Sequence, residues 1–89
     1  MRNIMQRVLL LCHPKLEAAR PYAEKWAREL NDVGTRTEIL EAWDDAAIRR
    51  AAPGSELAST RGGDGTLLRA ARWCSPGGVP VMGIRMGRV

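Results

Sequence analysis

The sequence lacks the features that would assign it at once to a common functional class. It has no run of lysine and arginine, no long apolar segment and no closely spaced pair of cysteines. The 14 basic residues are scattered from Arg2 to Arg88, so the net charge of +4 does not form the concentrated patch typical of nucleic-acid binding. We therefore expect no nucleic-acid partner.

The apolar segments and the cysteines exclude further classes of protein. The stretch RVLLLC, residues 7–12, is too short for the core of a signal peptide or for a membrane span. Cys12 and Cys74 lie far apart and show no CxxC or other metal-ligand spacing, which predicts two buried, reduced thiols. We expect a cytoplasmic protein with no membrane partner and no metal site formed by its own residues.

The length allows one small domain. A chain of 89 residues buries only about 60 to 65% of its unfolded surface, so its core is small. Hydrophobic residues make up 45% and charged residues 27%, which is the ordinary range for folded domains. Residues 1–89 are therefore expected to fold as a single domain.

The first half of the chain alternates between strand and helix patterns. The continuous apolar run at residues 7–14 predicts a strand buried on both faces. Residues 17–33 place apolar side chains at three- and four-residue steps, which predicts an amphipathic helix that begins near Arg20 and is capped by Gly34. Residues 36–40, RTEIL, form a second strand candidate.

The alternation continues in the second half. Asp44 and Asp45 are possible N-caps of a short helix that runs through Ala52. Residues 56–60, ELAST, are a strand candidate weakened by their polarity. The patterns also predict a further helix at residues 66–74 and a strand at 79–84. Such alternation predicts an α/β fold with three layers: a mostly parallel sheet of about four strands with flanking helices.

The segment GGDG, residues 62–65, is the strongest candidate for a functional site. Gly62, Gly63 and Gly65 surround Asp64 and remove the Cβ atoms that would keep a ligand from the backbone, and they also permit positive φ angles. In a parallel sheet this turn would lie at the carboxyl ends of the strands, where ligands bind. It is neither a Walker A sequence nor a Rossmann fingerprint.

The turn combines a preference for phosphate with a carboxylate. A helix that begins at Thr66 presents free N–H groups and a partial positive charge, which favour phosphate. Asp64 would repel that phosphate unless a cation or a hydroxyl group lay between them, an arrangement that suits phosphoryl transfer to an alcohol. The alternative is a tight turn in which Asp64 only caps the helix.

Residues 62–72, GGDGTLLRAAR, followed by VPVMGIRMGR at 79–88, resemble the N-terminal, Rossmann-like domain of the NAD kinases. The resemblance extends over nearly the whole chain, although only residues 62–72 are specific. A shorter GGDG also marks diacylglycerol and sphingosine kinases and is similar to turns of phosphofructokinases. The segments TLLRAAR and MGIRMGR favour NAD kinase among these families.

The resemblance implies roles for particular residues. Asp64 would accept a proton from the adenosine 2′-hydroxyl of NAD and, with Gly65, contact the dinucleotide. The phosphate donor would be ATP or polyphosphate, used with Mg²⁺. The remaining implied nucleotide-binding residues are Gly62, Gly63, Thr66, Arg69, Gly87 and Arg88. For Arg69, a solvated position on the helix surface is the alternative, and we interpret His13 as a loop residue with no catalytic role.

The sequence also departs from the family pattern. Arg61 stands where the family usually has a small or apolar residue, and Arg85 replaces the usual asparagine. The chain ends at Val89, where the family continues into a β-rich second domain, so we expect that domain to be absent and the fragment to be inactive alone. A homo-oligomer is expected because the apolar strand at 79–84 favours self-association. A non-catalytic nucleotide-binding or assembly module is the competing interpretation.

Overall fold

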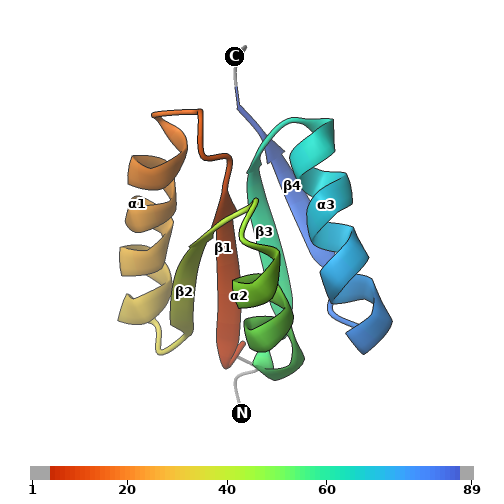
Figure 1. Cartoon of the computed structure of the whole chain (residues 1–89). Coiled ribbons are helices and arrows are strands. Elements are labelled where there is room, and N and C mark those ends of the chain that lie inside the picture. The colour runs from red at the N-terminus through yellow and green to blue at the C-terminus, as the bar shows by residue number, and fades with distance from the viewer. Residues whose placement is uncertain (1–4, 87–89) are drawn as a thin grey trace.

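The strands and helices assemble into three layers, with a parallel sheet between helices (Figure 1). The computed structural model describes residues 5–86. The elements, in chain order, are β1 (Arg7–Cys12), α1 (Ala19–Asp32), β2 (Arg36–Glu41), α2 (Asp45–Ala51), β3 (Leu57–Gly62), α3 (Asp64–Cys74) and β4 (Val81–Arg85), with short 3₁₀ turns at Ala52–Gly54 and Ser75–Gly77. The predicted fold class is confirmed.

The sheet order is β2-β1-β3-β4, and every neighbouring pair is parallel. The chain moves from β1 to one edge of the sheet, returns to β3 on the other side of β1, and then continues outward to β4. The strand order therefore reverses between β1 and β3, and the loops that leave these two strands meet at the point where open α/β sheets bind ligands. The register pairs Cys12 with Arg61 and Gly62 with Arg85.

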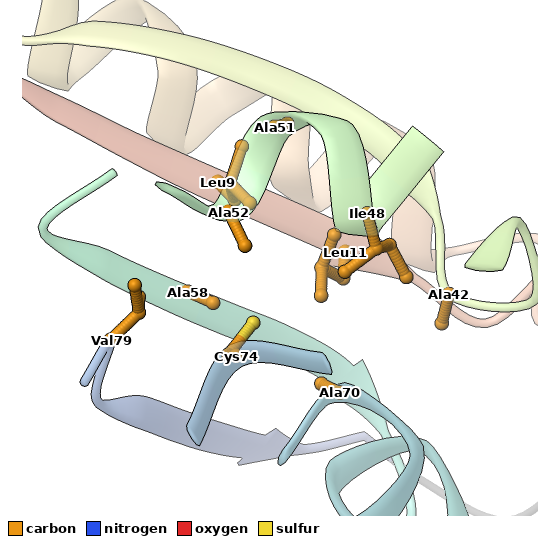
Figure 2. Close-up of a cluster of buried hydrophobic side chains, with 10 residues drawn as sticks. All are labelled: Leu9, Leu11, Ala42, Ile48, Ala51, Ala52, Ala58, Ala70, Cys74 and Val79. Carbon is orange, nitrogen blue, oxygen red and sulfur yellow. The ribbon is translucent and has the colours of Figure 1, made fainter. Parts of the chain in front are cut away.

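Each face of the sheet packs against its own helices because side chains alternate along β1. Val8, Leu10 and Cys12 face α1, where they meet the buried alanines Ala19 and Ala23. Leu9 and Leu11 face α2 and α3 on the other side, and Figure 2 shows them with Ile48 and Cys74 in one cluster. The prediction that this strand is buried on both faces is confirmed.

The helix ends follow local capping rules. Helix α1 begins at Ala19, one residue before the predicted start. Gly34, with a φ of +93°, donates its N–H to the carbonyl of Asn31 at 3.0 Å, so the predicted glycine cap is confirmed. The Asp44 carboxylate accepts a hydrogen bond from the N–H of Ala47 at 3.2 Å and is the N-cap of α2.

Several boundaries in the second half differ from the sequence expectation. Strand β3 continues to Gly62 instead of ending at residue 60, and β4 covers Val81–Arg85 instead of 79–84. Helix α3 begins at Asp64 and not at Thr66, because the carbonyl of Gly63 accepts a hydrogen bond from the N–H of Leu67 at 3.3 Å. Helical bonding thus starts inside the glycine turn.

Strand β3 lies in the middle of the sheet although its sequence is polar. Ser59, Thr60 and Arg61 are all buried, between β1 on one side and β4 on the other. Pairing with two parallel neighbours hydrogen-bonds the strand's backbone from both sides, and Leu57 and Ala58 add apolar contacts with the clusters on the two faces of the sheet.

Candidate functional site

The glycine turn connects the carboxyl end of β3 to the first residue of α3, as predicted. Gly62 is required by packing, since a Cβ there would lie 2.6 Å from Oγ1 of Thr66. Gly63 and Gly65 differ from Gly62, because a Cβ on either would meet no atom of residues 5–86 within 4 Å. Gly62 has a φ of +159°, whereas neither Gly63 nor Gly65 has a positive φ. Their missing side chains instead leave exposed backbone open to a ligand.

Asp64 occupies the first turn of α3 but does not cap the helix. Gly63 is the N-cap residue, and no side-chain hydrogen bond caps this end of α3. The Asp64 carboxylate, whose side chain is 77% exposed, instead accepts a hydrogen bond from Nη2 of Arg85 at 2.6 Å. The favourable interaction of a carboxylate with the amino end of a helix remains, but the capping alternative does not describe this structure.

A small cavity of about 180 Å³ lies beside the turn, between α3 and the ends of β3 and β4. It is lined by Thr60, Gly62, Gly63, Asp64, Leu67, Gly83, Ile84 and Arg85. A Cβ on Gly83 would approach the Leu67 side chain to 3.3 Å, so this glycine allows α3 to pack closely on β4. Among the described residues that line it, only Asp64 and Arg85 are charged.

A larger cavity of about 360 Å³ lies at the ends of β1 and β2 and beside the start of α1. Its lining includes three acidic residues, Glu17, Glu41 and Asp44, and one arginine, Arg20, so the excess of negative charge disfavours a phosphate. His13 also lines it, but Nδ1 of this residue accepts a hydrogen bond from the N–H of Lys15 at 3.0 Å. That bond stabilises the loop after β1, in keeping with the interpretation of His13 as a loop residue.

The other residues implied by the family resemblance lie in different surroundings. Thr66 is buried against Gly62, and its Oγ1 has no hydrogen-bond partner among the described residues. Arg69 donates two hydrogen bonds to Asp45 on α2, from Nε and Nη2 at 3.1 Å each. A phosphate contact by Arg69 stays a prediction, and it would have to compete with this pair. The two remaining residues, Gly87 and Arg88, lie outside the described residues.

Arg61, next to the turn, is fully buried on the α1 side of the sheet. Its guanidinium lies 4.6 Å from the ring centroid of Trp26, and Nη1 donates to the carbonyl and the hydroxyl of Ser59 at 3.0 and 3.1 Å. Nε and Nη2 have no partner among the described residues. Burial lowers the pKa of this arginine, and the sequence signalled it only as a departure from the family pattern.

The pair between Arg85 and Asp64 was not predicted. The sequence showed an arginine in place of the family's asparagine but did not show what it contacts. The register that pairs Gly62 with Arg85 brings the two residues together from positions 21 apart in the chain. A reader of the sequence could find this pair only by assuming that the third and fourth strands are parallel neighbours.

Residues 5–86 show neither a metal-binding cluster nor a membrane-spanning helix. They contain no group of three or more His, Cys, Asp or Glu side chains that could hold a metal ion. Within the same residues, no helix combines the length and the apolar character needed to cross a membrane. Cys12 and Cys74 are buried and free, as predicted.

These features define an α/β protein with a glycine-rich site at the carboxyl edge of a parallel sheet. The chain belongs to the family described as ATP-NAD kinase N-terminal domain, whose model matches residues 13–89. It is 35% identical to NAD kinase 2 of Streptomyces coelicolor, over 99% of this chain and 33% of that protein. It is 37% identical to an NAD kinase of Thermobifida fusca, over 92% of this chain and 30% of that protein.

A solved structure supports the fold. A putative diacylglycerol kinase from Bacillus anthracis superposes with a TM-score of 0.63 at 19% identity, over 97% of this chain and 32% of that chain. At this identity the likeness concerns the fold alone. The chain spans about a third of the length of the curated relatives it matches.

Proposed function

We propose that this chain provides the glycine turn and the proton acceptor for phosphoryl transfer from ATP or polyphosphate to the adenosine 2′-hydroxyl of NAD, which yields NADP. The observation that carries the proposal is Asp64, an exposed carboxylate at the start of α3 that is not used as a helix cap. Membership of the NAD kinase family supports the choice of reaction.

The residues of the turn have separate roles in this proposal. Asp64 would accept the proton of the attacking hydroxyl, because a positioned carboxylate can act as a general base. Gly63 and Gly65 would let the substrate approach the backbone, since neither needs to be glycine for packing or for conformation. Gly62 and Thr66 would shape the turn through their close contact, and Gly65 would also contact the dinucleotide.

The described residues fit Mg²⁺ only as an ion that arrives with the phosphate donor. Asp64 is the one carboxylate among the described residues that line the cavity, whereas a site formed by the protein alone needs several ligands. Mg²⁺ is commonly bound through one or two carboxylates together with substrate phosphates. When bound, it would neutralise negative charge on the transferring phosphoryl group.

We expect the reaction to need residues other than 1–89. The relatives are about three times as long as the part that this chain matches. One exposed turn and a cavity of about 180 Å³ do not enclose a dinucleotide and a phosphate donor together, and catalysis depends on accurate alignment of the reacting groups. A non-catalytic nucleotide-binding module remains the second candidate, because Asp64 is already paired with Arg85.

The proposal is tested in a chimera in which residues 1–89 replace the matching part of the Thermobifida fusca relative. NADP formation from NAD and ATP is measured for the chimera, for Asp64→Asn and for Asp32→Asn. Asp64→Asn should lower kcat by about 10² or more, because it removes the base with little change in volume. Asp32→Asn is the matched control, since Asp32 is an exposed aspartate at the far end of α1.

The results of the chimera assays distinguish the candidate functions from one another. Turnover by Asp64→Asn within twofold of the parent chimera would show that Asp64 is structural. Tight nucleotide binding by an inactive parent chimera would favour the binding module. Phosphorylation of diacylglycerol instead of NAD would favour the lipid-kinase alternative that the GGDG segment leaves open.

A further inference from the structure

Arg85 lies at the cavity beside Asp64 and is not explained by the fold. Its side chain is 73% exposed, and its ion pair with Asp64 is the only one it makes among the described residues. Exposed pairs of this kind contribute little to stability. The pair is also monodentate, because Nη2 alone contacts the carboxylate. The other N–H groups of the guanidinium are therefore available to a ligand.

Arg85 lies where its positive charge can reduce the repulsion between Asp64 and a bound phosphate. A phosphate that approaches the glycine turn meets the negative charge of Asp64, which opposes binding unless a cation is present. Arg85 places such a cation in direct contact with Asp64, at the edge of the same cavity. A planar guanidinium has five N–H donors and can bind a carboxylate and a phosphate at the same time.

Arg69, the other arginine near the turn, is less able to take this role. Both Nε and Nη2 of Arg69 donate to Asp45, and its guanidinium lies 4.9 Å from the ring centroid of Trp43. A phosphate could be bound by Arg69 only after this bidentate pair is broken. Arg85 needs no such rearrangement.

We propose that Arg85 is a phosphate-binding residue of this site, whose guanidinium neutralises Asp64 and contacts the phosphates of the donor substrate. The inference rests on the proposed function, because it assumes that a phosphate binds next to Asp64. It assigns a substrate contact to a position where the resemblance to the family predicts asparagine. Arg85 would thus hold the donor, whereas Asp64 would act on the hydroxyl of the acceptor.

The test measures binding of inorganic tripolyphosphate to the 89-residue chain by NMR titration. Tripolyphosphate carries the phosphate chain of the donor without a base or a sugar, so binding does not depend on an adenosine pocket. The variants are Arg85→Asn, Arg85→Lys and Arg72→Asn. Arg72 is an exposed arginine in the last turn of α3, at the other end of the helix, and serves as the control for net charge.

Arg85→Asn should weaken binding on the order of tenfold, because it removes a charge-assisted hydrogen bond to phosphate. It should also reduce the salt dependence of the dissociation constant. Arg85→Lys should recover part of the affinity, and Arg72→Asn should remain within about twofold of the parent. Asp64→Asn should strengthen binding because it removes the repelling charge.

Equal weakening by Arg85→Asn and Arg72→Asn would overturn the inference, as would the lack of saturable binding by the parent chain. The result is independent of turnover. If Asp64→Asn inactivates the chimera while Arg85→Asn binds tripolyphosphate normally, the proposed function stands and this inference fails. If Asp64→Asn leaves turnover intact while Arg85→Asn loses tripolyphosphate, the phosphate contact stands and the proposed base is wrong.

Discussion

Replacement of Arg61 by methionine is expected to stabilise the fold. Arg61 is fully buried in the central strand, and no carboxylate pairs with it among the described residues. Burial lowers the pKa of the guanidinium, yet a guanidinium does not give up its proton in proteins. The folded state therefore bears the cost of a buried charge.

The contacts of this side chain oppose part of the cost of burying its charge. Nε and Nη2 have no partner among the described residues, and each such donor costs about 1 to 3 kcal/mol. The contact between the buried guanidinium and the Trp26 ring offsets about 2 kcal/mol of this cost. The hydrogen bonds to Ser59 offset a similar amount. Methionine is long and unbranched, and its sulfur also packs well against aromatic rings.

Buried charges replaced by apolar side chains of similar volume often leave a protein more stable by about 1 to 4 kcal/mol. We expect Arg61→Met to raise the free energy of unfolding by about 1 to 3 kcal/mol. For a domain of this size, each kcal/mol raises Tm by about 4 to 8 °C. Urea unfolding followed by tryptophan fluorescence and thermal unfolding followed by circular dichroism would measure both quantities.

Two further variants separate charge from packing. Arg61→Lys keeps a charge but loses the planar stacking group, so it should be less stable than the parent. Arg61→Ala removes the charge and the packed stem together, so the cavity it leaves should make it less stable than Arg61→Met. A decrease in stability of more than about 1 kcal/mol for Arg61→Met would refute the reasoning, because it would mean that the contacts with Trp26 and Ser59 outweigh the cost of burial.

Three other predictions follow from the structure. The 89-residue chain alone should bind ATP and NAD weakly in titration calorimetry and form no measurable NADP in a coupled assay, and robust turnover would contradict the need for further residues. Burial raises the pKa of Cys74 from its ordinary value of 9.0, so the folded state keeps a proton that the unfolded state loses at high pH. The free energy of unfolding should therefore decrease as the pH rises above about 9. Urea unfolding at several pH values should show a smaller decrease for Cys74→Ala than for the parent. An equal decrease in both proteins would count against burial of Cys74 as the cause. Met82 on β4, an edge strand of the described sheet, is 39% exposed, so the chain should associate weakly with itself in sedimentation velocity, and Met82→Lys should reduce this association; unchanged sedimentation would argue against β4 as the contact.

The sequence by itself determined the type and order of the elements and the place of the turn. Residues 7–12 are a continuous apolar run, and residues 19–32 repeat apolar positions at helical spacing, so neighbours in the chain are enough to predict β1 and α1. The glycine turn follows from the same local information, because it separates a strand pattern from a helix pattern. Its glycines were recognisable, although their conformations were not.

The tertiary structure alone decided which charged residues meet. Arg61 is buried because Trp26 of α1, 35 positions earlier, covers it, and no local pattern in β3 contains that information. Arg69 pairs with Asp45 across two helices, and Arg85 reaches Asp64 only because β3 and β4 are parallel and in a particular register. Periodicity reports how a residue relates to its neighbours in the chain, whereas each of these contacts depends on where two distant elements are placed by the packing of the whole sheet.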